Sequence, residues 1–238
     1  MKVLIGSNPI DLERAIPELK AVHPEVEFVH CADRENLQEM IADADVYMGW
    51  LGRDDFRAAE ELRWIQSPSS GVNYFLQIPE LVRSDVLLTS AVGTHSICLA
   101  ESTIAMILTF TRGIKDALDA QRRHRWENRQ IRSTLVELTG GVLGIVGFGS
   151  VGRALAQRAA GFEMRILAVD LYPTDRPDEV DALWPVDRLH EMLAQSDYVV
   201  VTVPWTPETE GMIGPDQIAA MKTGAMLVGI SRGGIIDQ

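Results

Sequence analysis

The sequence predicts an α/β protein of two domains, each built on a parallel β-sheet with helices on its faces. Short apolar runs alternate with polar, helix-like stretches, which is the rhythm of strand–helix–strand units. A length of 238 residues is long for one domain and sufficient for two, and 46% hydrophobic residues can fill two cores. A glycine-rich turn, GFGSVG at residues 147–152, lies at the start of a second alternating series.

The first series predicts five strands and a first domain that spans residues 1–97. The strands are the apolar runs KVLIG, VEFVH, DVYMGW, LRWIQS and VLLTS, at residues 2–6, 26–30, 45–50, 62–67 and 86–90. Residues 11–20 and 33–44, which separate the early runs, have the composition of helices. Strands that alternate with helices in this way pair in parallel, because each helix returns the chain to the same end of the sheet.

Residues 98–121 predict one long helix that leaves the first domain. Its apolar side chains recur at near-helical spacing, at Leu99, Thr103, Met106, Ile107, Phe110, Ile114 and Leu118. The polar stretch that follows, residues 122–133, carries five arginines. An anion-binding patch is one interpretation, but charge runs are usually solvated, so we favour a solvated or subunit-contacting surface.

The second series predicts four more strands, at residues 142–146, 164–170, 197–204 and 225–231. Between them lie helix-like stretches at residues 150–161, 186–196 and 215–222. With the linking helix included, the second domain spans residues 98–238.

Composition excludes several classes of function. The net charge of −12 makes a general attraction to nucleic acid or to an anionic membrane unfavourable, although a local cation can still bind a small anion. Cys31 and Cys98 form no CxxC motif, so we expect no disulfide framework and no metal site. The first ten residues hold an apolar run too short for a signal or a membrane span. These features predict a cytoplasmic protein with two inert thiols.

The glycine-rich turn has the GxGxxG spacing, with Gly147, Gly149 and Gly152 between an apolar strand and an alanine-rich helix. In that context Gly147 permits a tight turn, Gly149 lets the backbone approach a pyrophosphate, and Gly152 lets the helix pack closely on the strand. The free N–H groups at the helix N-terminus then face the phosphates.

An acidic residue follows at the distance expected for a dinucleotide site. Asp170 ends the next apolar run, 18 residues beyond Gly152, where a carboxylate accepts hydrogen bonds from the adenosine ribose. Its charge repels a 2′-phosphate, so the sequence favours NAD over NADP. Arg176 lies close enough in sequence to keep NADP open as an alternative.

The second half of the chain resembles the D-isomer-specific 2-hydroxyacid dehydrogenases, which include phosphoglycerate, glyoxylate/hydroxypyruvate and formate dehydrogenases. The resemblance rests on LTGGVLGIVGFGSVGRALAQRAAGFEMRILAVD, SDYVVVTVPWTPETEGMIG and MKTGAMLVGISRGGIIDQ, and it is looser before residue 138. It implies a flavodoxin-like substrate domain, a Rossmann nucleotide-binding domain and a catalytic cleft between them. It also implies NAD as cofactor, a small 2-oxo or 2-hydroxy acid as substrate, and a homodimer.

The resemblance assigns roles to individual residues. Arg232 falls on the arginine that binds the substrate carboxylate and orients the 2-oxo group, and a guanidinium suits this because its planar fork matches a carboxylate. Ser70 and Gly71 fall on the loop whose backbone N–H groups hold the same carboxylate. His95 falls where many members carry a substrate-side asparagine, and helix capping explains it equally well. Positions that match the lining of the dinucleotide are Ser150, Val151, Val203, Pro204, Thr209, Ile230, Ser231 and Arg232.

Each assignment has a structural alternative. Arg232 could form a salt bridge, Ser70 and Gly71 could form an ordinary turn, Thr209 could cap a helix, and the apolar positions could belong to the core.

The resemblance leaves the proton donor unassigned. An alkoxide formed by hydride delivery needs a proton from a group that titrates near neutral pH, and a guanidinium does not deprotonate in proteins. The family uses a histidine paired to a glutamate, both downstream of the segment that ends at Gln238. We therefore expect a nucleotide domain that stops before its last strands, and a 238-residue polypeptide that is inactive toward glyoxylate, hydroxypyruvate and pyruvate. The alternative is a non-catalytic dinucleotide-binding protein with a regulatory, co-repressor-like role.

Overall fold

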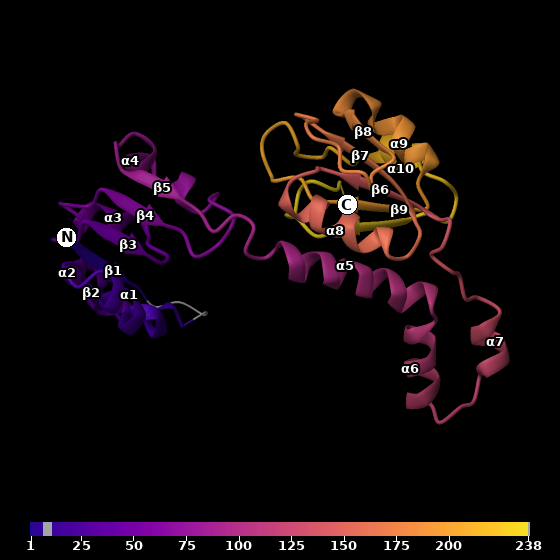
Figure 1. The fold of residues 1–238 in the computed structure, drawn as a ribbon, viewed down its shortest axis with the longest axis horizontal. Coiled ribbons are helices and arrows are strands. Elements are labelled where there is room, and N and C mark those ends of the chain that lie inside the picture. Colours follow the sequence, from indigo (N-terminus) through magenta and orange to yellow (C-terminus); the bar gives the residue numbers. More distant parts are fainter. Residues whose placement is uncertain (7–10, 238) are drawn as a thin grey trace. The chain divides into compact units, whose positions relative to one another are not determined.

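The computed structural model describes residues 1–6 and 11–237, and residues 7–10 of the N-terminal segment discussed above lie outside that range. The chain divides into two compact units, Met1–Thr94 and His95–Gln238 (Figure 1). Within the described residues, each unit contains one five-stranded sheet whose strands are all parallel. The α/β fold with two parallel sheets is therefore confirmed.

The first unit has the strand order β2-β1-β3-β4-β5. All five strands coincide with the predicted apolar runs: β1 (Lys2–Ile5), β2 (Glu27–His30), β3 (Val46–Met48), β4 (Trp64–Gln66) and β5 (Leu87–Thr89). The helices are α1 (Ile16–Val22), α2 (Leu37–Ile41), α3 (Arg53–Ala58) and α4 (Pro79–Val82). This strand order is the flavodoxin-like one, in which the chain reverses direction across the sheet between β1 and β3.

The second unit has the strand order β10-β9-β6-β7-β8. Its strands are β6 (Val142–Val146), β7 (Arg165–Asp170), β8 (Ala182–Pro185), β9 (Tyr198–Val201) and β10 (Met226–Gly229), and the helices between them are α8 (Ser150–Ala160), α9 (Leu189–Gln195) and α10 (Pro215–Ala220). Four of these strands were predicted. The fifth, β8, was missed because its short ALWP sequence has no alternation and ends in proline.

Successive residues of the central strands of this sheet enter two different cores. Leu143 and Ile145 pack with residues of α8 and of a preceding helix, α5 (Ser96–Thr111). Val146, Val199 and Val201 pack with α9 on the opposite face. Burial on both faces explains why these strands are continuous apolar runs.

The prediction of one long helix over residues 98–121 was wrong. The structure has α5 followed by α6 (Ile114–Arg122), and the two axes are bent by 64°. Gly113 lies between them with φ +62°, a left-handed conformation that continues no α-helix. The arginine-rich stretch then contains a short helix, α7 (Asn128–Arg132), and α6 and α7 extend away from the second sheet (Figure 1).

Hydrophobicity and length do not predict a membrane-spanning helix. No single helix in the described part of the chain is long and apolar enough to cross a membrane, and α5 and α6 meet that test only when taken together across their bend.

We predict that Gly113→Ala destabilises the second unit by more than Gly211→Ala does. The two glycines have nearly the same φ, +62° and +61°. A Cβ atom at Gly113 would lie 2.7 Å from Ile131 Cγ2 and 2.9 Å from Leu135 Cδ2, whereas one at Gly211 would meet nothing within 4 Å. Each substitution should cost about 1–2 kcal/mol of stability, because alanine is strained in the left-handed conformation. Only Gly113→Ala adds a steric overlap to this cost. Urea unfolding measures the difference, and equal losses would show that the side chains of Ile131 and Leu135 move aside at no cost.

Candidate functional site

The three glycines of the GxGxxG turn have different surroundings. Gly147 follows β6 with φ +93°, and a Cβ there would lie 2.8 Å from Val203 Cγ1. A Cβ at Gly152 would lie 2.5 Å from the carbonyl oxygen of Gly147, so only glycine allows α8 to pack this close. A Cβ at Gly149 would meet nothing within 4 Å, which leaves open space beside the turn.

The open space lies at the N-terminus of an eleven-residue helix. Gly149 is the N-cap of α8, and Ser150, Val151 and Gly152 form its first turn. Backbone N–H groups in a first helical turn have no acceptor within the helix, and the helix dipole adds a partial positive charge there. The residues present therefore fit the pyrophosphate of a dinucleotide.

Asp170 joins the glycine turn to the loop that follows β7. Its Oδ2 accepts the N–H of Phe148 at 2.6 Å, and its Oδ1 accepts the N–H of Tyr172 at 2.9 Å. A carboxylate oxygen can accept more than one hydrogen bond, so both retain capacity for ribose hydroxyls. The carboxylate is thus held in a fixed orientation by two backbone groups.

Arg153 holds the next part of the same loop and was not identified from the sequence. It donates from Nη1 to the carbonyl of Asp175 at 3.0 Å and from Nη2 to the carbonyl of Thr174 at 3.2 Å. Its guanidinium carbon also lies 4.9 Å from the ring centroid of the buried Phe148. The only signal in the sequence was an arginine directly after the glycine motif, at the start of the helix.

Arg176 is the residue whose place in the sequence left NADP open as an alternative cofactor. In the structure its side chain is bound within its own loop. Its Nη1 donates to the carbonyl oxygen of Val180.

The segment after β9 supports the glycine turn from the other side. Thr202 donates from Oγ1 to the carbonyl of Gly147 at 2.7 Å, a contact that sequence reasoning missed. Val203 is partly buried, and Pro204 is exposed. Thr209 accepts the N–H of Thr206 at 2.8 Å and lies 2.7 Å from the carbonyl of Pro204, so its hydroxyl stabilises a turn and caps no helix.

The segment after β10 carries Ile230, Ser231 and Arg232. Ile230 donates its N–H to the carbonyl of Val201, which continues the pairing with β9. Arg232 is exposed and donates from Nη1 to the carbonyl of Ser231 at 2.9 Å. It forms no ion pair with any residue in the described ranges, so the salt-bridge alternative has no support.

All these groups lie at one edge of the second sheet. Gly147, Thr202 and Ile230 directly follow β6, β9 and β10, and the carboxyl ends of parallel strands share an edge. The strand order also reverses between β6 and β9, since β7 and β8 lie on one side and β10 on the other. Ligands of open α/β sheets bind at such a reversal, outside the carboxyl ends of the strands.

The candidate residues of the first unit lie in the loop after β4. Ser70 donates from Oγ to the carbonyl of Ala91 at 3.0 Å, and the N–H of Gly71 is taken by Ser69 Oγ at 3.1 Å. The N–H of Ser70 has no acceptor among the described residues. Of the two backbone N–H groups predicted to hold a carboxylate, that of Ser70 is therefore available, and that of Gly71 is hydrogen-bonded within its own loop.

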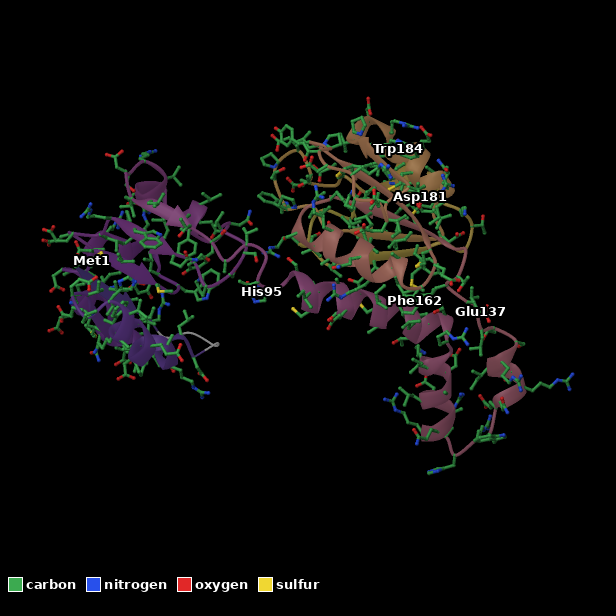
Figure 2. All side chains as sticks on the ribbon, viewed as in Figure 1. Met1, His95, Glu137, Phe162, Asp181 and Trp184 are labelled. Atoms are coloured by element: carbon green, nitrogen blue, oxygen red, sulfur yellow. The ribbon has the colours of Figure 1, made fainter. Side chains whose placement is uncertain are left out.

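His95 begins the second unit, at the N-terminal end of α5 (Figure 2). It occupies the N-cap position of that helix, but its side chain forms no capping hydrogen bond. His95 therefore occupies the N-cap position, as the capping alternative expected, but its imidazole does not cap the helix. Within the part of the chain that the structure describes, no three His, Cys, Asp or Glu side chains are grouped to hold a metal ion.

Residues 104–238 match the family model described as D-isomer specific 2-hydroxyacid dehydrogenase, NAD binding domain. The D-3-phosphoglycerate dehydrogenase of Methanocaldococcus jannaschii is 33% identical over 242 residues, a match that covers 100% of this chain and 45% of that protein. The D-3-phosphoglycerate dehydrogenase of Homo sapiens is 30% identical over 217 residues, or 87% of this chain and 40% of that protein. The chain thus spans less than half the length of these curated relatives.

Solved structures show the same fold over the whole chain. A D-isomer specific 2-hydroxyacid dehydrogenase family protein from Aeromonas salmonicida subsp. salmonicida superposes with a TM-score of 0.88 at 26% identity, covering 100% of this chain and 74% of that one. A D-lactate dehydrogenase from Aquifex aeolicus, solved with NAD and lactic acid, superposes with a TM-score of 0.77 at 24% identity, covering 99% and 70%. The second likeness concerns the fold alone.

We predict that Gly149→Val and Gly152→Ala fail in different ways. Valine at residue 149 enters open space, so the urea midpoint should stay unchanged while NADH binding is abolished. Alanine at residue 152 meets the carbonyl of Gly147 and should lower the free energy of unfolding by about 1–3 kcal/mol, the usual cost of overpacking. Calorimetric titration with NADH and urea unfolding of both variants separate the effects. Wild-type NADH affinity in Gly149→Val would contradict the placement of the cofactor.

Proposed function

Because the chain belongs to the D-isomer-specific 2-hydroxyacid dehydrogenase family, we propose that it binds NAD(H) and acts on a small 2-oxo or D-2-hydroxy acid. The observation that carries the proposal is the open space at Gly149, beside the first turn of α8 and the fixed carboxylate of Asp170. When bound there, the cofactor supplies or accepts a hydride. The residues of this chain bind the pyrophosphate and ribose, and they orient the acid.

We assign the adenosine ribose to Asp170. Its two oxygens are aligned by the N–H groups of Phe148 and Tyr172, so no reorganisation is needed when the ribose hydroxyls bind. Arg153 holds the carbonyls of residues 174 and 175 and so limits the movement of the loop beside them. The fixed negative charge supports NAD over NADP, and the engagement of Arg176 with Val180 supports the same preference.

We propose the remaining predicted positions as contacts of the rest of the dinucleotide. Backbone N–H groups of Ser150 and Val151 suit the phosphates because they open α8. Val203, Pro204, Thr209, Ile230 and Ser231 follow β9 and β10 at the same edge of the sheet, where the nicotinamide half would lie.

We propose that Arg232 binds the carboxylate of the acid. Its guanidinium is exposed and free of ion pairs with described residues, so both prongs of its fork could reach a carboxylate. We assign the backbone N–H of Ser70 to the same carboxylate. The N–H of Gly71 is assigned to it as well, after a local rearrangement that releases this N–H from Ser69 Oγ.

Proton transfer needs a different group, since a guanidinium does not deprotonate in proteins. Reduction of the 2-oxo group produces an alkoxide, which requires a general acid that titrates near neutral pH. We propose His95 as the first histidine of this chain to replace in a search for the proton donor.

We further propose a homodimer in the cytoplasm. The arginine-rich stretch supports subunit contact, because Trp126 within it is 91% exposed and aromatic residues are enriched in protein–protein interfaces. Cys31 and Cys98 are both free thiols, as in a reducing compartment.

Asp170→Asn should narrow the preference for NADH over NADPH by about tenfold or more. Two unit charges ~4 Å apart interact with about 1 kcal/mol in water and about 4 kcal/mol near a protein surface, and about 1.4 kcal/mol is tenfold in affinity. Asparagine keeps one oxygen acceptor, so it can retain only one of the two hydrogen bonds that Asp170 accepts, from Phe148 or from Tyr172. The matched control is Asp175→Asn, which removes the same charge from an exposed residue of the loop. Dissociation constants for both cofactors test this, and an unchanged ratio in Asp170→Asn would remove Asp170 from the ribose.

Arg232→Lys should weaken binding of oxamate, a 2-oxo acid analogue that cannot be reduced, by about ten- to a hundredfold in the NADH-saturated protein. An ammonium keeps the charge but cannot reproduce a two-pronged contact, and hydrogen bonds between charged groups contribute about 1.5–3 kcal/mol. NADH affinity should change little. Arg165→Lys, at the opposite edge of the sheet, is the control. Wild-type oxamate affinity in Arg232→Lys would show that the arginine does not hold the carboxylate.

A further inference from the structure

Arg153 contacts two segments of the candidate cofactor site that lie far apart in the sequence. On one side, its guanidinium carbon lies 4.9 Å from the ring centroid of Phe148, in the glycine turn. On the other side, it donates to the carbonyls of Thr174 and Asp175 at 3.2 Å and 3.0 Å, in the loop after β7. One side chain of α8 therefore joins the turn before the helix to a loop that follows 21 and 22 residues later.

The guanidinium of Arg153 is directed at the backbone of this loop and at no acidic side chain. It forms no ion pair with any residue in the described ranges, and the residue is half-buried. A charged donor forms stronger hydrogen bonds than a neutral one, and the planar fork of a guanidinium suits two acceptors at once. The role of Arg153 is therefore not that of a surface salt bridge.

The part of the loop that Arg153 holds has a strained backbone. Asp175 has φ +43°, a left-handed conformation that is uncommon for residues other than glycine. Such conformations cost free energy and persist only where surrounding contacts impose them. Among the described residues, the one hydrogen bond of Asp175 is the one that its carbonyl accepts from Arg153. Loss of Arg153 would therefore let this residue relax to an ordinary conformation.

The same loop aligns the carboxylate that we assign to the adenosine ribose. Asp170 Oδ1 accepts the N–H of Tyr172, which lies two residues before Thr174. Asp170 Oδ2 accepts the N–H of Phe148, whose ring lies under the Arg153 guanidinium. Both backbone donors that orient the carboxylate thus belong to segments that Arg153 contacts.

We propose that Arg153 is a positioning residue for the adenosine half of the cofactor. By holding the carbonyls of residues 174 and 175, it keeps the loop after β7, and with it the Asp170 carboxylate, in the conformation that binds. This role rests on the NAD(H) binding proposed above, and it does not require Arg153 to touch the cofactor. Arg153 forms no hydrogen bond with described residues of the segments after β9 and β10, to which we assign the nicotinamide half. Only the adenosine half should therefore depend on it.

The test divides the cofactor into its two nucleotides, AMP and reduced nicotinamide mononucleotide, each with one phosphate. NMR titration of the whole chain measures both dissociation constants. In Arg153→Met we expect AMP to bind about tenfold more weakly, because the apparent dissociation constant rises by the reciprocal of the fraction of chains whose loop is in place. The affinity for reduced nicotinamide mononucleotide should not change. Methionine favours a helix and can still pack on Phe148, so the loss is that of the charge and the hydrogen bonds.

Two further variants serve as controls. Arg153→Lys keeps the charge but cannot reproduce the planar fork, so it should recover only part of the affinity for AMP. Full recovery would assign the effect to charge alone and would overturn the proposal. Arg158→Met lies on the same helix and removes an ion pair with Glu101 at 3.0 Å, away from the loop, so it should change neither affinity.

The outcomes separate this role from a general effect on the fold. Unchanged affinity for AMP in a folded Arg153→Met would overturn the proposal. Equal losses for both nucleotides would also overturn it, because loosening of the whole unit affects both halves. Should Arg153→Met unfold, Arg153→Lys decides alone: a loss confined to AMP supports the role, and wild-type affinity overturns it. A wild-type chain that binds neither nucleotide nor NADH would contradict the proposed function itself, and this role with it.

Discussion

The close approach of Gly152 to the carbonyl oxygen of Gly147 determines how α8 leaves β6. A Cβ at Gly152 would lie only 2.5 Å from that oxygen, so the helix can begin this near the strand only without a side chain. Gly147 is confined in turn by Val203 from the segment after β9. Strand, helix and neighbouring segment are thus fixed against one another, and the N-terminus of α8 is held at the carboxyl edge of the sheet with open space beside Gly149.

Asp170 and Arg153 extend this arrangement to the next loop. The carboxylate binds one N–H on each side, at Phe148 and Tyr172, and the guanidinium binds two carbonyls farther along. Phe148 lies between them, buried under the Arg153 guanidinium. Asp170, to which we assign the choice of cofactor, is therefore also a residue that holds the loop in place. A change of cofactor preference at Asp170 must keep an acceptor for these two N–H groups.

The two edges of each parallel sheet satisfy their backbone groups in different ways. At the amino edge, aspartates accept N–H groups at or near the start of strands: Asp45 for Lys2, Asp197 for Val142 and Asp181, labelled in Figure 2, for Ile166. At the carboxyl edge of the second sheet, the glycine turn instead leaves helix N–H groups open to a ligand.

The sequence by itself determined the features that local pattern encodes. The apolar runs predicted all five strands of the first unit and four of the second, and the GxGxxG spacing with Asp170 18 residues on indicated the dinucleotide site. The quoted motifs also identified the family, because residue types at fixed spacing are a property of the chain alone.

Only the tertiary structure decided what depends on residues far apart in the chain. The helix broke at Gly113, where Ile131 and Leu135 fill the space that a side chain would need. Arg153 and Thr202 became part of the site through carbonyl groups 22 and 55 residues away. A pocket at the amino edge of the second sheet is lined by four separate segments, from residues 110–111, 134–141, 197–198 and 222–226. The hydrophobic periodicity of the sequence indicates which face of a helix or strand is buried. The atoms that this face contacts are determined by long-range packing.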